Sequence, residues 1–382
     1  AALAASLCAG AARAVAPCGD SEVKLEHGGL SRSAALYAPP AACGPGRPAP
    51  PLLVALHCFG CEPNWGRRRI GTLVEPLGWL LLLPQGVGRS WNAGACCGEA
   101  RRLGLDDVGF VVRLLDLAVA RWGARKDALF ALGYSNGGFL ASLIPAASHL
   151  PLRAVAPASG HDYGPQALRM QGAAVFSFAS KGDTVVRAQG CCPGARCCCN
   201  ISEARGAGAP CVSSEQIAQG LREANGCGGK QPSRYAYRGV TCAAGRGCTA
   251  ATVSCLWERK NHQHGNSEGH FCDVVLLFAR LLGPGPGQLP RCRPNLPAEL
   301  RTALLASQGH GISASQGHSV PATKLLAAAA LGGLLALSAF WLCRACGWPI
   351  CPRSGAAAAA AATVAARAKR QPARAARSMA AG

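Results

Sequence analysis

The feature that most constrains the fold of this chain is the hexapeptide GYSNGG at residues 133–138. An apolar run, residues 128–132, precedes it, and residues 139–144 continue it with a helical apolar pattern. Together these segments predict a strand, a sharp turn and a helix, with Ser135 at the turn. Glycines two positions before and two positions after this serine allow the backbone to pack closely there. We therefore expect an α/β sheet that presents Ser135 at the carboxyl end of a strand.

The same spacing, G-x-S-x-G, is typical of a nucleophile elbow, in which a strained turn exposes a serine hydroxyl at the edge of the sheet. The N–H of Asn136 then opens the following helix, where it can face a developing negative charge. In a chain of 382 residues with 48 glycines, an ordinary glycine turn is the alternative. The flanking strand and helix patterns favour Ser135 as a nucleophile and Asn136 as an oxyanion donor.

A serine nucleophile needs a basic histidine and an acid that orients it, and in this kind of sheet the acid precedes the histidine in the chain. Asp183 follows an apolar, strand-like run at residues 174–179. Ligand-handling groups gather at the carboxyl ends of strands in open α/β sheets. We therefore expect Asp183 to be the acid, with a plain turn aspartate as the alternative.

Three histidines, His262, His264 and His270, lie between a late strand-like run at residues 251–257 and an amphipathic, helix-like run at residues 271–280. A base is expected in this loop, and the pattern alone leaves the choice among the three open. Glu268 lies among them, so a metal site is the alternative. The H-x-H spacing lacks a further ligand at helical spacing, and we expect no metal.

With these residues in place, the chain resembles the secreted esterase family of feruloyl esterases and polyhydroxybutyrate depolymerase-like proteins, a branch of the α/β-hydrolases. The likeness covers roughly residues 20–285. It rests on ordered motifs: LH at 56–57, PQG at 84–86, SWNAGACCG at 90–98, DDVGF at 106–110, the elbow with its additional Asn136 and Gly138, and NGC at 225–227.

The resemblance implies that the serine and the aspartate act as nucleophile and orienting acid. Aligning the family's Gly-His-x-Trp-Pro segment on Cys255 and Trp257 places its base on His262, with His264 as the reserve. The loop after the LH motif supplies a second oxyanion N–H in this family, which falls on Cys58. No cofactor is implied.

Two departures from the family pattern leave a rival interpretation open. Cys58 stands where a glycine is usual, and Ala179-Ser180 replaces a His-Gly pair before the acid. The side chain of Cys58 either crowds the oxyanion site or points away from it. The rival to an active enzyme is a catalytically weak or inactive cell-surface binding protein on the same fold.

The resemblance implies a serine carboxylic ester hydrolase that works through an acyl-enzyme. Its substrates are expected to be hydroxycinnamoyl esters of polysaccharides or short polyesters. Strand-like and helix-like segments alternate through the middle of the chain, which favours a mostly parallel central sheet flanked by helices. Residues 106–123 carry an apolar stripe at helical spacing and predict a helix that packs on this sheet.

The remaining segments predict a membrane-anchored protein of the secretory pathway. Residues 1–16 are small and apolar with an A-x-A-like end, which predicts a signal peptide with a truncated start. The esterase domain is expected over 17–285, and a stalk over 286–324. Residues 325–343 carry no charge and predict a single transmembrane helix, with a buried or interfacial helix as the alternative. The basic, low-complexity tail at 344–382 fits the cytoplasmic side of a type I anchor.

Cysteine usage agrees with an extracytosolic domain. Of 22 cysteines, 18 fall between the leader and the membrane segment, an even number that is consistent with disulfides. Residues 191–211 form a cysteine-rich insertion without the ligand spacing of a zinc finger, which favours a disulfide knot over a zinc site. Asn200 in this insertion begins an N-glycosylation sequon.

The formal net charge of +20 raises the question of a nucleic-acid partner. Arginine outnumbers lysine by 32 to 7, and no run of basic residues interleaved with aromatic ones is present. Compositional bias is the simpler source of the charge, so we expect no nucleic-acid partner. The pattern leaves the oligomeric state open.

Overall fold

The computed structural model describes residues 16–302 except 45, 63, 95, 161–171, 191–211, 229–230, 284–288 and 301. These residues belong to one unit of the chain, Arg13–Ala314. The expected signal peptide, the cysteine-rich insertion with Asn200, most of the stalk, the expected transmembrane helix and the basic tail lie outside the described residues. Within the described ranges, no helix combines the length and the apolar character that a bilayer crossing needs.

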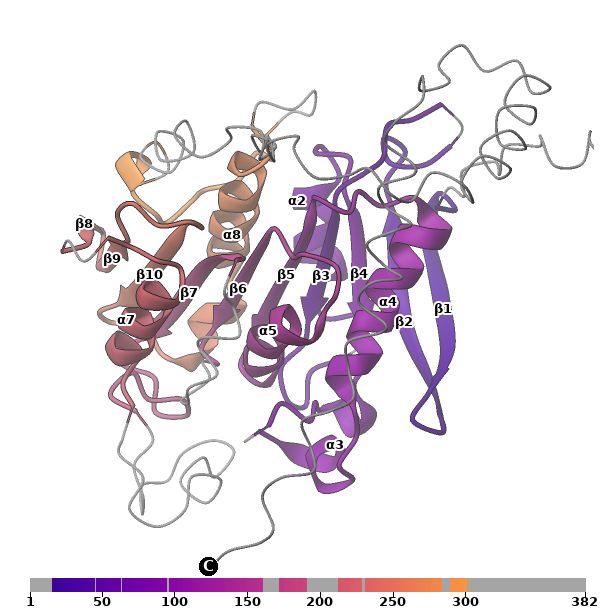
Figure 1. The fold of residues 1–382 in the computed structure, drawn as a ribbon, viewed down its shortest axis with the longest axis horizontal. Helices are drawn as coiled ribbons and strands as arrows, with labels where there is room; N and C mark the ends of the chain where they lie inside the picture. The colour runs from indigo at the N-terminus through magenta and orange to yellow at the C-terminus, as the bar shows by residue number, and fades with distance from the viewer. Residues whose placement is uncertain are drawn as a thin grey trace, which may run out of the picture. The chain divides into compact units, whose positions relative to one another are not determined.

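A ten-stranded mixed sheet runs through the described part of the chain in the order β1-β2-β4-β3-β5-β6-β7-β10-β9-β8 (Figure 1). Its strands are β1 (Gly19–His27), β2 (Leu30–Ala38), β3 (Leu52–Leu56), β4 (Leu80–Pro84), β5 (Leu129–Tyr134), β6 (Ala154–Ala158), β7 (Ala174–Ser180), β8 (Ser233–Tyr237), β9 (Val240–Ala244) and β10 (Thr252–Trp257). The six central strands pair in parallel, and antiparallel strands extend both edges. The predicted mostly parallel α/β sheet is confirmed.

The central strands are buried on both faces, which explains why their sequences are continuous apolar runs. Every residue of β3, β4 and β5 is buried. A parallel sheet that is covered by helices on both sides selects this pattern. Edge strand β1 alternates more exposed and more buried positions instead, as expected for a strand with a solvated face.

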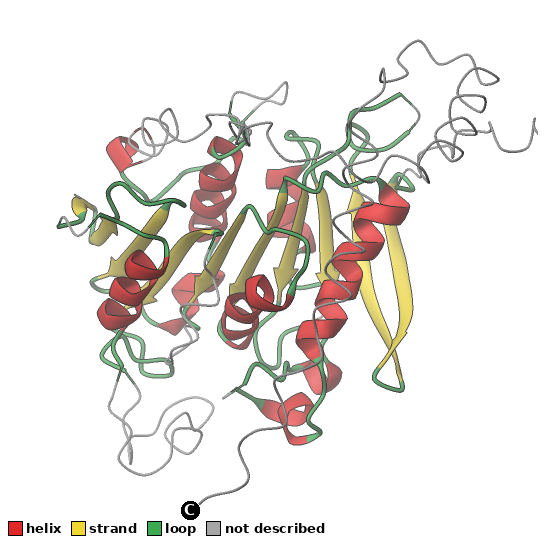
Figure 2. Ribbon diagram, viewed as in Figure 1, coloured by secondary structure: helices red, strands yellow, loops and turns green. Residues whose placement is uncertain are grey.

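Helices cover both faces of the sheet (Figure 2). They are α2 (Arg67–Val74), α3 (Gly98–Arg102), α4 (Asp107–Trp122), α5 (Asn136–Ala147), α7 (Ser214–Ala224) and α8 (Glu268–Arg280), with short 3₁₀ turns η1 (Val87–Arg89) and η4 (His262–Asn266). The apolar sides of α4, α5 and α7 belong to one core cluster, and those of α2 and α8 to a second cluster across the sheet.

Helix α4 confirms the helix predicted over residues 106–123. Asp106 caps it by accepting a hydrogen bond from the N–H of Gly109 at 2.8 Å. Gly123 ends it in the left-handed region, with a φ of 67°.

Six disulfides join cysteines of the described ranges, as the even cysteine count predicted. They are Cys18–Cys43, Cys58–Cys61, Cys96–Cys97, Cys227–Cys248, Cys242–Cys255 and Cys272–Cys292. The pairing was not readable from the sequence, because it depends on which loops the sheet brings together.

A buried ion pair connects α4 to the antiparallel edge of the sheet. The Arg32 guanidinium on β2 donates to Oδ1 of Asp107 at 2.5 Å, and both residues are at most 3% exposed. Asp107 Oδ2 accepts the N–H of Asn92 at 2.7 Å. The pair therefore also holds the segment around Asn92 against the start of α4.

We expect Arg32→Leu to lower the free energy of unfolding by about 3–5 kcal/mol, because it leaves the Asp107 carboxylate buried without its counter-charge. Chemical denaturation measures the loss. The exposed pair of Arg125 and Asp127 provides the control, and Asp127→Asn should cost about 1 kcal/mol or less. Equal losses for the two variants would contradict this account of the buried pair.

Candidate active site

Ser135 lies at the turn between β5 and α5, as the GYSNGG pattern predicted. Its φ of 54° and ψ of −120° lie in a region that side-chain-bearing residues rarely adopt. A Cβ on Gly133 would overlap the carbonyl oxygen of Gly137, and one on Gly137 would overlap that of Leu56. Close backbone contacts therefore leave no room for a side chain at either glycine. The turn directs the Ser135 side chain away from the strands.

A continuous hydrogen-bonded chain joins the serine to a histidine and an aspartate. Nε2 of His262 lies 2.9 Å from Oγ of Ser135, and its Nδ1 lies 2.7 Å from Oδ2 of Asp183. A carboxylate can only accept, so Nδ1 of His262 carries the proton and Nε2 accepts the hydroxyl of Ser135. This is the protonation pattern that a histidine needs in order to act as a general base.

The parallel register of β7 and β10 explains why the aspartate and the histidine meet. Trp257 at the end of β10 pairs with Ser180 at the end of β7, so the loops that follow the two strands lie side by side. The Gly182 N–H donates to the carbonyl of Lys260 at 3.1 Å and joins these loops. Asp183 is the first residue beyond this link.

Asp183 is held by the backbone that follows it. Its Oδ1 accepts the N–H groups of Val185 and Val186, each at 2.8 Å. Its Oδ2 remains for His262. With 2% of its surface exposed, Asp183 is shielded from water, and both carboxylate oxygens have fixed donors.

The other two candidate histidines lie elsewhere. The His264 ring packs against Trp257 with ring centroids 4.1 Å apart, and its half-buried position, together with the charge of Lys260, lowers its pKa to about 4. His270 packs edge-on against Phe178, and its full burial lowers its pKa to about 3. The structure brings His262, and neither His264 nor His270, to Ser135.

His270 also corrects the expected start of the last helix. The apolar pattern places that start at residue 271, but α8 begins at Glu268 because Ser267 caps it and accepts the N–H of His270 at 3.2 Å. His270 therefore lies in the first turn of α8 rather than in the preceding loop.

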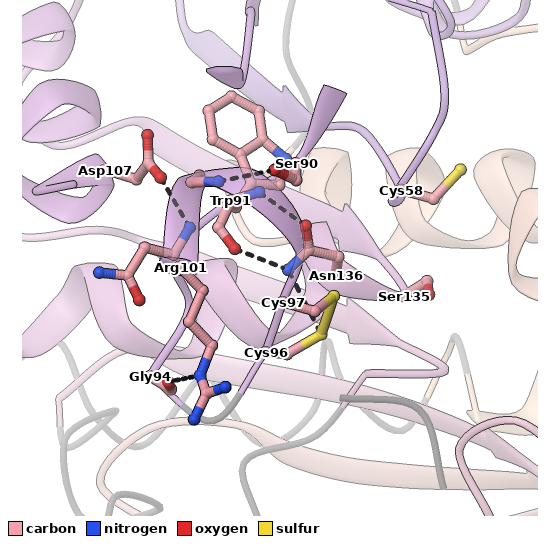
Figure 3. The surroundings of a disulfide bond; sticks show 12 residues. Cys58, Ser90, Trp91, Gly94, Cys96, Cys97, Arg101, Asp107, Ser135 and Asn136 are labelled. Carbon is pink, nitrogen blue, oxygen red and sulfur yellow. Dashed lines mark hydrogen bonds between the residues drawn. A yellow bond between two sulfur atoms is a disulfide. The ribbon is translucent and has the colours of Figure 1, made fainter. Parts of the chain in front are cut away.

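The two expected oxyanion donors lie on adjoining segments. Asn136 is the first residue of α5, where helix N–H groups have no intrahelical acceptor. The loop after β3, which carries Cys58, packs against the same helix start, since a Cβ on Gly137 would meet the carbonyl of His57. Cys58 forms a disulfide with Cys61 in its own loop, a link that the C-x-x-C spacing could have indicated. Its side chain points away from Ser135 in Figure 3.

Two cavities in the described ranges do not have Ser135, Asp183 or His262 in their lining. One cavity of about 1270 Å³ lies over β1, β2 and α2, and includes Trp65 and Asn266. A smaller one of about 200 Å³ lies among β7, β9, β10 and α7. The candidate site is identified by its hydrogen-bond geometry.

Both ring nitrogens of His262 are occupied by Asp183 and Ser135, which leaves neither for a metal ion. Throughout the described ranges, no group of three or more His, Cys, Asp or Glu side chains is arranged to hold a metal. The hydrogen-bonded Ser135, His262 and Asp183 are groups that offer nucleophilic and acid–base chemistry.

The buried His270 predicts a loss of stability in acid. Below the unfolded-state pKa of 6.5 the unfolded chain gains a proton at His270, whereas the folded protein resists it down to a pKa of about 3. The free energy of unfolding should therefore fall between pH 6.5 and 3, by up to about 1.4 kcal/mol per pH unit from this residue.

Denaturation of His270→Phe across this pH range tests the prediction, and its slope should be shallower than that of the unmodified protein. His149→Gln is the control, because the His149 side chain is 68% exposed, and its slope should be unchanged. If the free energy of unfolding fell with the same slope in His270→Phe and in the unmodified protein, the lowered pKa of His270 would be refuted.

Comparison with known proteins finds similarity to esterases. No family profile matches the chain. Feruloyl esterase B of Neurospora crassa is 25% identical over 101 residues, which cover 25% of this chain and 34% of that protein. The match thus spans about a third of the length of the curated relative.

Two solved structures are among those that resemble the chain. The poly(3-hydroxybutyrate) depolymerase LpqC from Bordetella parapertussis is 14% identical, with a TM-score of 0.45 over 75% of this chain and 95% of that one. An acetyl xylan esterase from Aspergillus awamori is 11% identical, with a TM-score of 0.44 over 63% of this chain and 94% of that one. The similarity to feruloyl esterase B confirms the resemblance to esterases that the motifs predicted.

Proposed function

We propose that the protein is a serine carboxylic ester hydrolase that acts through an acyl-enzyme. The observation that carries this proposal is the hydrogen-bonded chain from Ser135 through His262 to Asp183, with contacts of 2.9 and 2.7 Å. These residue types, in this order and at these distances, supply a nucleophile, a general base and an orienting acid.

In this mechanism Ser135 Oγ attacks the ester carbonyl carbon while His262 Nε2 takes the hydroxyl proton. The carbonyl oxygen becomes an oxyanion, which the N–H groups of Asn136 and Cys58 stabilise. The C–O bond to the leaving group breaks, and His262 delivers its proton to the departing alkoxide. Water, activated by the same imidazole, then releases the acid and restores Ser135.

The substrate class is proposed from similarity. The similarity to feruloyl esterase B supports hydroxycinnamoyl esters of polysaccharides as substrates. The likeness to polyhydroxybutyrate depolymerase-like proteins supports short polyesters as substrates. Turnover of a feruloylated oligosaccharide against a hydroxybutyrate oligomer would separate them.

The alternative is a binding protein that keeps the fold without turnover. It is motivated by Cys58 and by the segment after His262, where Gln263, His264 and Gly265 stand in place of the family's x-Trp-Pro. The hydrogen bonds of His262 to Ser135 and Asp183 support the enzyme, because they hold the base and the nucleophile in the geometry that acyl transfer needs.

We also propose that the protein acts outside the cytosol. Six disulfides in the described ranges and the similarity to a fungal feruloyl esterase support this location. The anchor at 325–343, the stalk at 286–324 and glycosylation of Asn200 belong to the same proposal, and they rest on the sequence alone.

Ser135→Ala should lower kcat for p-nitrophenyl acetate by a factor on the order of 10⁴ to 10⁶, because the reaction then has no covalent nucleophile. His262→Ala should show a comparable loss. The control, His149→Gln, changes an exposed histidine and should keep full activity.

A fluorophosphonate probe tests the same proposal without a known substrate. It should label the unmodified protein with one equivalent and leave Ser135→Ala unlabelled, since only an activated serine reacts. A folded, unmodified protein that takes up no label would favour the binding protein, and a labelled Ser135→Ala would remove Ser135 as the nucleophile.

A further inference from the structure

Trp91 is fully buried and bonds to both segments that carry the oxyanion donors. Its indole Nε1 donates to the carbonyl oxygen of His57 at 2.9 Å. Its backbone N–H donates to Oδ1 of Asn136 at 2.7 Å, and its carbonyl accepts from Nδ2 of the same side chain at 3.0 Å. Figure 3 shows this paired contact beside Ser135. One residue thus links the loop after β3 to the start of α5.

The bond to His57 fixes the direction of the neighbouring N–H. The carbonyl of His57 and the N–H of Cys58 belong to one peptide group, and in a trans peptide these two bonds point in opposite directions. A donor that holds the carbonyl therefore turns the N–H of Cys58 to the other side. It also polarises that N–H and strengthens it as a donor.

The first donor is arranged in the same way. The carbonyl of Ser135 shares a peptide group with the N–H of Asn136, and it accepts from the N–H groups of Gly138 at 2.8 Å and Phe139 at 3.1 Å. Both donor peptides are therefore held from behind through their carbonyl oxygens. The helix supplies the partners for the Ser135 carbonyl, and the Trp91 indole supplies a partner for the His57 carbonyl.

The His57 side chain supports the same loop. The N–H of Gly86 donates to Nε2 of His57 at 3.0 Å, so this nitrogen is unprotonated, and Nδ1 donates to the carbonyl of Cys58 at 2.8 Å. Burial lowers the pKa of His57, which keeps the ring in this neutral form. The ring lies 4.5 Å from that of Trp91, so ring contact adds to the indole hydrogen bond.

The Trp91 segment is itself firmly anchored. The Cys97 N–H donates to the carbonyl of Trp91 at 3.0 Å. Nδ2 of Asn136 lies 3.4 Å from Sγ of Cys96, which forms a disulfide with Cys97. The next residue, Asn92, is held by the buried Asp107. Movement of the indole relative to α5 would have to break several buried bonds.

We propose that Trp91 is a positioning residue that sets the direction and the separation of the two N–H donors, Asn136 and Cys58, around the oxyanion. It acts through the His57 carbonyl and the Asn136 side chain, and it does not contact the ester. The proposal rests on the ester hydrolase function proposed above.

Trp91→Phe tests the proposal, because it keeps a ring against His57 and the backbone bonds to Asn136 but removes the indole donor. We expect kcat for p-nitrophenyl acetate to fall about 10- to 100-fold with KM within about twofold, since the oxyanion contacts form only in the transition state. Trp79→Phe is the matched control, because Trp79 is also buried and stacks on Phe130 in the other core cluster. This variant should keep its kcat.

A second readout separates positioning from general destabilisation. Trifluoromethyl ketones form an anionic tetrahedral adduct on the serine, so their affinity should fall in parallel with kcat in Trp91→Phe. A neutral amide analogue of the substrate should bind as before. Unchanged kcat and unchanged ketone affinity would overturn the proposal, and so would an equal loss for the amide.

Fluorophosphonate labelling keeps this result distinct from a failure of the proposed function. Trp91→Phe should still reach one equivalent of label, more slowly, whereas a protein without an esterase site takes up none in any form. Should Trp91→Phe fail to fold, replacing Trp91 by 3-benzothienylalanine preserves the ring shape and exchanges the N–H for sulfur. The analogue should show the same loss of kcat, and full activity in it would overturn the proposal.

Discussion

The structure depends on a close approach of backbone to backbone around the turn between β5 and α5. Gly133, Gly137 and Gly160 lie so near carbonyl oxygens that a Cβ at any of them would overlap one. The N–H of Ser135 donates to the carbonyl of Ala158 at 2.8 Å, which ties the strained residue to the next strand. Because main chain alone makes these contacts, the position of Ser135 is fixed by the sheet rather than by a loop. The cost of its positive φ is offset by this surrounding packing.

The rest of the site follows from strand register. Parallel strands end at the same edge, so the loops after β7 and β10 meet there even though Asp183 and His262 are 79 residues apart. The aspartate is oriented by two backbone N–H groups, and it in turn fixes the proton on His262. The backbone of the sheet thus positions Asp183, and Asp183 positions His262. In the proposed reaction, this hydrogen-bonded chain needs little reorganisation when charge develops.

The sequence was sufficient for the features that depend on local pattern. The elbow at Ser135 and helix α4 follow from spacing, and the family alignment selected His262, which the structure brings to Ser135. Features that depend on distant contacts were not accessible. Trp91 and His57 are 34 residues apart, and nothing in the SWNAGACCG motif indicates that the indole reaches a carbonyl after β3. The start of α8 was missed because Ser267 outweighs the apolar pattern as a helix signal.

These contacts explain how Cys58 can stand where the family that this chain resembles usually has a glycine. The group expected to meet the oxyanion is the N–H of the peptide between His57 and Cys58, so the side chain at position 58 matters only if it occupies the space in front of that N–H. Its sulfur is bonded to Cys61 within its own loop. The direction of the peptide is set from behind, by the Trp91 indole on one carbonyl and by the His57 ring on the next. A site built this way constrains the orientation of the 57–58 peptide more strongly than the identity of residue 58. The departure from glycine is therefore compatible with a working oxyanion site.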